Sequence, residues 1–246
     1  AEVGYVPRNN YIKLNPYVNY LFFPGKRGTV LSHGPKFNGT YYYNSSLKKT
    51  DHENLFLYIF NLRDQSIFDV WVADSYTKLL RPFDPTNSNK DSLAAGTEHR
   101  WKAFGIEFFS KPQRLLTYNI STRFGGYYAD GNRYNVTADI GYRFQPYVGI
   151  TLSTTYNDIH LPAPWNNTRF WLIGPRVDVT FTNKLFLTTF VQYNNQQKNI
   201  NLNTRFQWRY RPASDIFLVY TDNYYASPIF VRNRAFVLKA TYWWNN

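Results

Sequence analysis

The stretch NINLNTRFQWRY, residues 199–210, alternates between two kinds of side chain along its whole length. Its even positions are Ile200, Leu202, Thr204, Phe206, Trp208 and Tyr210, and its odd positions are Asn199, Asn201, Asn203, Arg205, Gln207 and Arg209. Successive side chains of a β-strand point to opposite faces of the sheet, so this strand has one apolar face and one polar face. Such alternation predicts a strand that separates an apolar environment from a wet one.

The same alternation recurs in 133–144, 148–156, 170–181 and 235–244, and no segment has a convincing helical period. We therefore expect about 13–14 strands in an all-β, antiparallel fold. The expected strands are 11–23, 35–44, 53–62, 67–78, 101–110, 115–125, 133–144, 147–157, 170–181, 185–194, 199–210, 215–223 and 235–244. Most of them have the roughly 9–11 residues that a tilted strand needs to cross a bilayer.

Composition narrows the class of protein. Aromatic residues, which favour strands, make up 20% of the 246 residues, and there is no cysteine. Disulfides, cysteine-based metal sites and thiol catalysis are therefore excluded. No apolar run reaches the roughly 18 residues of a membrane-spanning helix. The formal net charge of +12 allows anionic lipid, anionic solutes or nucleic acid as partners.

The connections between the expected strands alternate in length. Residues 62–66, 111–114, 145–146, 182–184 and 211–214 form short turns, whereas 79–100, 158–169 and 224–234 form long loops. Short turns on one rim and long loops on the other are typical of a transmembrane outer-membrane β-barrel. Aromatic side chains at the short-turn ends predict an interfacial girdle. This girdle consists of Tyr142, Phe144, Phe181, Trp208, Tyr210, Tyr242 and Trp244. The alternative is a soluble β-sandwich or propeller.

Three segments carry a resemblance to a known family. EVGYVPRNNY near the start, residues 194–224 with their Arg-Pro-x-Ser-Asp turn, and the closing RAFVLKATYWW resemble an uncharacterised outer-membrane family of Bacteroidetes. In that family a carbohydrate-binding-module (family 9)-like domain precedes a C-terminal β-barrel. The resemblance implies that residues 1–246 are one barrel domain, the C-terminal part of a longer chain. The thirteen strands expected above also suggest that strands are missing upstream, because single-chain bacterial barrels have even numbers of strands. The family supplies no catalytic residues.

Charged residues are concentrated on the polar faces of the expected strands. The basic members, which would face the lumen, are Arg123, Arg133, Arg143, Arg176, Arg205, Arg209 and Lys239. The acidic members are Glu107, Asp139 and Asp178. A net cationic lumen would favour anions in a channel. The alternative is a set of cross-strand ion pairs that stiffen the wall.

The expected loops supply further candidates. Trp165, Tyr224, Tyr225 and Phe230 could contact glycans or pack on one another to cap the barrel. Loop cations could bind lipopolysaccharide phosphates or form an ordinary solvated surface. They are Lys48, Lys49, Arg81, Lys90, Arg100, Arg169, Arg232 and Arg234. The last strand would be recognised by the barrel-assembly machinery, and other outer-membrane proteins are further candidate partners.

Motifs for catalysis are weak. No nucleophile elbow, zinc-protease motif, phosphate-binding loop or dinucleotide fingerprint occurs. Asp158 with His160 could serve a rim-site hydrolase, and Asp51, His52 and Glu53 could hold a metal, but consecutive strand residues cannot all face one ion. Basic and aromatic residues lie on opposite faces, which argues against nucleic-acid binding.

We therefore predict a non-enzymatic, porin-like outer-membrane pore or transporter for small polar, anionic or glycan-derived solutes, without a cofactor. The alternatives are an accessory barrel of an export or nutrient-uptake complex and, third, a rim-site hydrolase.

Overall fold

The computed structural model describes residues 10–88 and 91–244, and within them the chain forms fourteen β-strands and one 3-10 turn. The strands of the N-terminal part are β1 (Tyr11–Leu14), β2 (Tyr17–Asn19), β3 (Val30–Asn44), β4 (Lys49–Leu62), β5 (Ile67–Lys78), β6 (Glu98–Phe109) and β7 (Leu116–Gly125). After the 3-10 turn η1 (Tyr128–Asp130) come β8 (Asn132–Phe144), β9 (Val148–His160), β10 (Thr168–Thr182), β11 (Leu185–Asn194), β12 (Asn199–Arg211), β13 (Ser214–Ala226) and β14 (Ile229–Ala240). The all-β class is confirmed.

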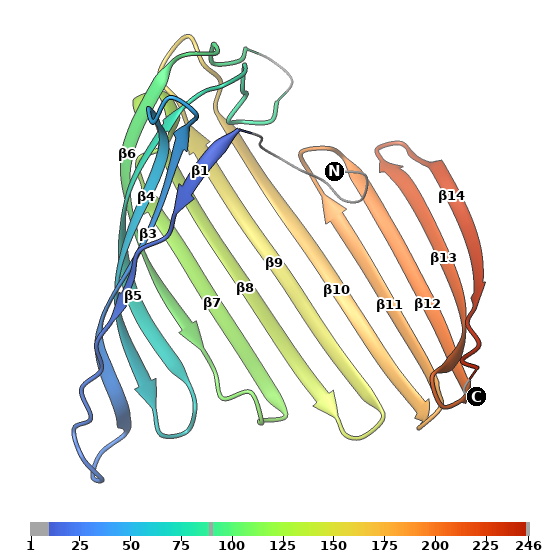
Figure 1. Cartoon of the computed structure of the whole chain (residues 1–246). Coiled ribbons are helices and arrows are strands. Elements are labelled where there is room, and N and C mark those ends of the chain that lie inside the picture. The colour runs from blue at the N-terminus through green and yellow to red at the C-terminus, as the bar shows by residue number, and fades with distance from the viewer. Residues whose placement is uncertain (1–9, 89–90, 245–246) are drawn as a thin grey trace. The chain divides into compact units, whose positions relative to one another are not determined.

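The strands form one antiparallel sheet in sequence order, from β1 through β3 to β14, with β2 paired to β3 (Figure 1). The expected first strand, 11–23, is divided because Asn15–Pro16 separates β1 from β2, and proline cannot donate a ladder hydrogen bond. Among the described residues no ladder joins β14 to β1, so the sheet is open in its pairing. A membrane barrel is therefore not established by the strand pairing.

The described residues divide into two compact units. The first contains 10–109, 121–135 and 158–168, and the second contains 110–120, 136–157 and 169–244. Strands β3 to β6 lie side by side in the first unit, and β11 to β14 lie side by side in the second (Figure 1).

In the second unit the register places apolar residues on one face of the sheet. On β12, Phe206 lies opposite Leu187 of β11 and Leu218 of β13, and Leu218 in turn lies opposite Leu238 of β14. The other face of β12 has Arg205 opposite Thr188 and Gln207 opposite Phe217. The alternation of residues 199–210 therefore continues across neighbouring strands as an apolar face and a polar face.

The first unit has the same division. Phe56, Val72 and Phe104 lie in one row across β4, β5 and β6, and all three are more than half exposed. The opposite face carries Glu53 and Glu107, together with Leu55 and Leu57. Exposed large apolar side chains that lie in one row mark a surface for interaction.

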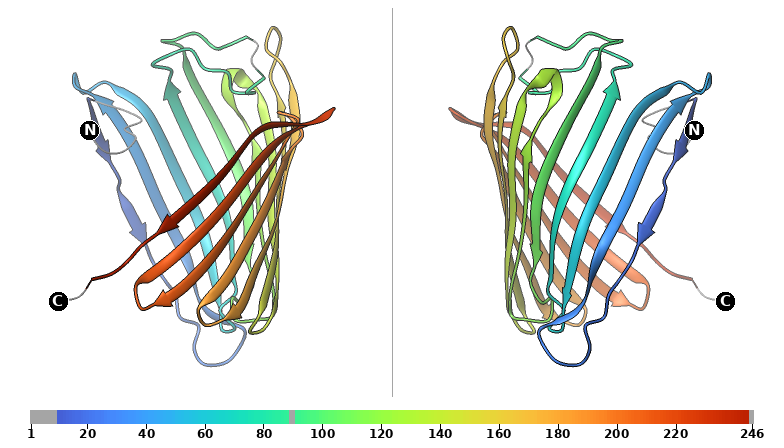
Figure 2. Two further views of the ribbon diagram at one scale, coloured as in Figure 1. Left: turned by 90° about the vertical axis from the view of Figure 1, so that its right-hand side faces the viewer. Right: turned by 90° about the vertical axis from the view of Figure 1, so that its left-hand side faces the viewer.

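The connections alternate in length less clearly than the sequence predicted. Residues 79–97 and 161–167 form loops, but 227–228 are all that joins β13 to β14. The predicted long loop 224–234 is wrong, because β13 and β14 extend through it as a hairpin in which Tyr225 pairs with Phe230. Both views of Figure 2 show the 79–97 connection near η1, at the β5–β6 end of the first unit.

Within the described part of the chain, no helix has the length and apolar character that a membrane span requires.

Candidate functional site

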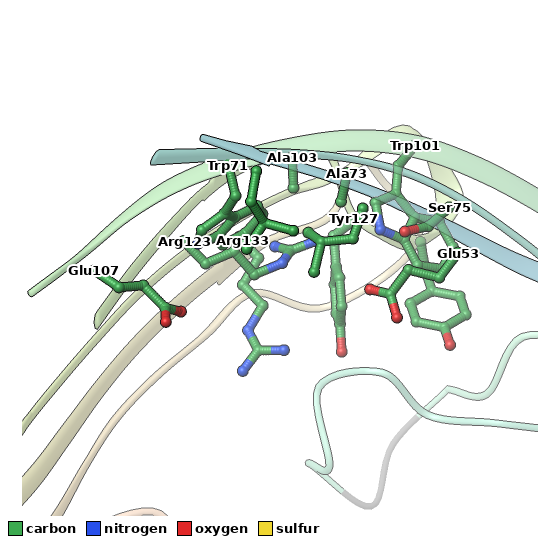
Figure 3. A pocket seen from close by; sticks show the side chains of 13 residues that line it. Glu53, Trp71, Ala73, Ser75, Trp101, Ala103, Glu107, Arg123, Tyr127 and Arg133 are labelled. Atoms are coloured by element: carbon green, nitrogen blue, oxygen red, sulfur yellow. The ribbon is translucent and has the colours of Figure 1, made fainter. Parts of the chain in front are cut away.

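The polar face of the first unit contains a cavity of about 480 Å³, within the size range of small-molecule sites (Figure 3). Side chains from β4 to β8 and from η1 surround it. Its charged and aromatic lining consists of Glu53, Trp71, Trp101, Glu107, Arg123, Tyr127, Tyr128 and Arg133.

Small residues make room for the cavity. Ala73 of β5 and Ala103 of β6 lie opposite each other in the cavity lining and are 4% and 3% exposed. Gly105 lies opposite Trp71, and a Cβ at Gly105 would fall 2.4 Å from the Trp71 ring and 2.0 Å from the Thr122 carbonyl oxygen. Glycine at 105 therefore lets the Trp71 indole lie across β6.

An aromatic wall is formed where the chain turns from β7 into η1. Gly125 has a φ of +123°, a conformation that side chains disfavour, and the next residue, Gly126, donates a backbone hydrogen bond to Lys102 of β6. This turn brings Tyr128 to 4.6 Å from the ring of Trp101 and 5.1 Å from that of Phe83. Burial raises the pKa of Tyr128 to about 12, so the phenol is protonated at neutral pH.

Arg123 and Arg133 both lie over the ring of Tyr127 in this wall. The guanidinium carbons of Arg123 and Arg133 lie 5.6 and 5.4 Å from the centroid of Tyr127. Nη2 of Arg123 donates to the Gly126 carbonyl at 2.9 Å, whereas its Nη1 is buried without an acceptor. Nε1 of Trp71 is also buried without an acceptor. Buried donors are normally satisfied, so these two stand out among the donors of the cavity residues.

Carboxylates flank the arginine pair. In Figure 3, Glu107 and Glu53 lie on either side of Arg123 and Arg133. Glu107 accepts a hydrogen bond from Ser121 Oγ at 2.9 Å, and it lies opposite Asp69 across the β5–β6 ladder. The lining thus combines two carboxylates with two guanidinium groups, and it offers both acceptors and donors.

A second cavity, of about 330 Å³, adjoins the first. The two share Glu53, Ser75, Trp101 and Tyr128, and the second extends toward Asp51 and Thr77. Trp101 therefore lines both cavities, and together they make one larger site on the polar face of the first unit.

The polar face of the second unit is more strongly basic. Arg176, Arg205 and Arg209 surround a cavity of about 280 Å³ with Asp178. Arg176 Nε pairs with Asp178 at 2.7 Å, and Thr188 donates to the same carboxylate at 2.8 Å. Arg176 and Asp178 both belong to β10, so this pair lies within one strand. A cross-strand ion pair, which the sequence offered as the alternative to an open cationic lumen, joins Arg209 Nε of β12 to Asp215 Oδ1 of β13 at 3.5 Å. Lys239 lies opposite Phe217, on this same face.

Arg143 and Asp139 also belong to the polar face of β8 by alternation along the strand. Arg143 donates from Nη2 to the carbonyls of Pro112 and Arg114, at 2.6 and 2.5 Å. Arg143 therefore holds the connection 110–115 against β8 through these two hydrogen bonds.

The expected aromatic girdle lies at one end of the second unit. Tyr142 and Phe144, Trp208 and Tyr210, and Tyr242 and Trp244 form three ring contacts with centroids 4.6, 6.0 and 6.1 Å apart. Phe181, at the end of β10, is half exposed. The last strand ends at Ala240, before Tyr242 and Trp244.

Several residues expected in loops lie on strands instead. Tyr224 and Tyr225 belong to β13 and Phe230 to β14, and the rings of Tyr225 and Phe230 stack at 4.4 Å across the hairpin. Trp165 does lie in a connection, 161–167. The strand-forming propensity of tyrosine, phenylalanine and valine outweighed the proline that suggested a loop.

The expected loop cations are divided in the same way. Lys49 belongs to β4, Arg100 to β6, Arg169 to β10, and Arg232 and Arg234 to β14. Arg100 pairs with Asp74 at 3.2 Å, and Arg234 pairs with the fully buried Asp222 at 2.7 Å. Lys48 and Arg81 lie in connections, and Lys90 lies outside the described residues.

The proposed catalytic and metal candidates form no larger cluster. Asp158 and His160 pair at 2.8 Å on one face of β9, as neighbours two residues apart can do. Asp51 and Glu53 line the cavities, whereas His52 Nε2 lies 3.0 Å from Asp74 Oδ2. No group of three metal-binding side chains occurs in the part of the chain that the structure describes.

Sequence reasoning identified Glu107, Arg123 and Arg133 but missed the aromatic wall. Trp71 and Trp101 lie at the alternating positions that place side chains on the polar face of their strands. Tyr127 and Tyr128 follow a glycine pair. Aromatic residues on the polar face of an alternating strand could have indicated this wall from the sequence.

Comparisons of the chain with protein-family models, curated proteins and solved structures found no match.

Proposed function

We propose that this chain is all or part of an outer-membrane β-barrel that forms a pore or transporter for small polar solutes, and that it is not an enzyme. The observation that carries the proposal is the separation of an exposed apolar face from a charged face that contains cavities. A closed barrel would place the apolar face in lipid and the charged face in an aqueous lumen.

The length of the apolar face supports a bilayer location. On β12 it extends from Ile200 to Tyr210, about 34 Å at roughly 3.4 Å per residue. With the tilt of about 40° common in membrane barrels, that length projects to about 26 Å, close to the roughly 25 Å apolar band of such proteins. The aromatic pairs at one end supply the amphipathic rings expected at a membrane interface.

Charge on the polar face supports a preference for anions. In the second unit, Arg176, Arg205, Arg209 and Lys239 outnumber Asp178 and Asp215. Rings of arginine and lysine favour anions in a pore. The first unit contributes the cavity in which two carboxylates offset two guanidinium groups. This cavity would act as the site where polar solutes are recognised. The resemblance to the Bacteroidetes outer-membrane family is consistent with this role and remains part of the proposal.

The test is single-channel conductance of the full chain in a planar bilayer, with the reversal potential measured under a salt gradient. We expect stable steps and anion preference. Replacing Arg205 and Arg209 by Gln should shift the reversal potential toward zero, whereas Lys48→Gln, at an exposed position in the turn between β3 and β4, should leave it unchanged. A folded protein that gives no conductance would contradict the pore and favour an accessory barrel in a larger complex.

A further inference from the structure

We infer that the two adjoining cavities of the first unit bind a neutral saccharide, with one sugar ring against Trp101. The inference rests on the proposed function, since it names the class of polar solute that the polar face recognises.

Hydrogen-bonding groups in the site match hydroxyl groups. The guanidinium groups of Arg123 and Arg133 contribute donors to the lining, and Glu53 and Glu107 contribute acceptors. A hydroxyl group both accepts and donates, so a ring that carries several hydroxyls can satisfy both kinds of group at once. A ligand with acceptors alone would offer no donor to Glu53 and Glu107.

The aromatic wall supplies an apolar surface beside these groups. Trp101 lines both cavities and contacts Tyr128 at 4.6 Å, which fixes the orientation of its indole. A pyranose ring has an apolar face of C–H groups and an edge of hydroxyls. A rigid aromatic ring flanked by planar charged side chains complements both parts.

Charge balance argues against a simple anion as the ligand. The two guanidinium groups are offset by Glu53 and Glu107, with Asp69 opposite Glu107. A free phosphate would gain attraction from Arg123 and Arg133 but meet repulsion from these carboxylates. The volumes of two cavities that share Trp101, about 480 and 330 Å³, suit an oligosaccharide better than a compact ion.

The experiment is isothermal titration of the full chain in detergent with maltotriose, cellotriose and mannotriose. We expect saturable binding of at least one of them with a Kd of about 1 mM or below. Trp101→Ala should weaken that binding at least about tenfold, as expected for an aromatic ring that stacks on the ligand. Trp208→Ala, on the apolar face of the second unit, is the matched control and should bind as the wild type does.

A second variant protects the test against misfolding. Trp101→Tyr keeps an aromatic ring and should retain binding within about threefold, while Glu53→Gln should weaken it several-fold by removing a charged acceptor. The inference is overturned if no trisaccharide binds, if Trp101→Ala binds as tightly as the wild type, or if phosphate at equal concentration displaces the sugar.

Binding in detergent does not require an open lumen, so the two proposals fail separately. Saccharide binding without conductance would refute the pore and keep the site. Conductance without saccharide binding would keep the pore and refute the site.

Discussion

Replacing Leu218 by arginine tests whether the apolar face lies in lipid. Leu218 lies between Phe206 of β12 and Leu238 of β14 on that face. Phe206 is four residues from Tyr210 at the aromatic end, about 14 Å along the strand and about 10 Å along the membrane normal at a tilt near 40°. Leu218 therefore lies close to the middle of the roughly 25 Å apolar band.

An arginine near the midplane of a barrel's lipid-facing surface costs about 2–4 kcal/mol. The folding equilibrium of Leu218→Arg should therefore fall by about 30- to 700-fold, at a factor of ten for each 1.4 kcal/mol. In a water-soluble protein the same change at a partly exposed position would cost about 0.5 kcal/mol or less.

The assay is reversible unfolding in lipid vesicles by guanidinium chloride, followed by tryptophan fluorescence. Thr221→Arg is the control, because Thr221 lies on the polar face opposite Asn203 and Ala235. It loses one hydrogen bond from Asn203 Nδ2 and should cost about 1 kcal/mol. Equal costs for the two variants, or a cost under about 0.5 kcal/mol for Leu218→Arg, would refute the assignment of the faces.

Three further outcomes are expected. Gly105→Ala should destabilise the fold by about 1–3 kcal/mol, because its Cβ would meet the Thr122 carbonyl and Trp71. Gly149→Ala is the control. No atom lies within 4 Å of the Cβ added there, so this variant should not lower the midpoint of unfolding by guanidinium chloride. Asp222→Ala should lower that midpoint more than Asp178→Ala does. Asp222 is fully buried and accepts hydrogen bonds from Tyr220, Tyr224 and Arg234, whereas Asp178 and its partner Arg176 are about half exposed. Equal midpoints for the two variants would contradict this. The raised pKa of Tyr128 means that the folded state holds this proton more tightly than the unfolded state, so its contribution is complete below about pH 10 and is lost as the pH rises toward about 12. Tyr128→Phe should make unfolding curves less dependent on pH in that range, and an unchanged pH dependence would contradict the environment described for this phenol.

Alternation predicted the strands well where one face was uniformly apolar. Residues 67–78 and 185–194 have the bounds expected from sequence, because β5 and β11 end at turns that break the pattern. The hairpin of β13 and β14 was missed because Ser227–Pro228 looked like part of a loop. In the structure the strand-forming aromatic residues on either side pair directly across this two-residue turn.

The cavity could not be predicted from the sequence. It depends on the register that places Ala73 opposite Ala103 and Trp71 opposite Gly105. A shift of one residue would have turned these side chains to the other face. The inward course of Tyr127 and Tyr128 depends on Gly125, whose positive φ the sequence allows but does not require.

If one face of the sheet contacts lipid while the other contacts water, the environment should alternate from residue to residue along 199–210. The chain has no cysteine, so a cysteine can be introduced singly at each position, spin-labelled, and examined in lipid vesicles for collisions with oxygen and with a water-soluble nickel complex. We expect labels at even positions from 200 to 208 to collide more with oxygen and labels at odd positions to collide more with nickel. Equal access of nickel to all twelve positions would contradict it.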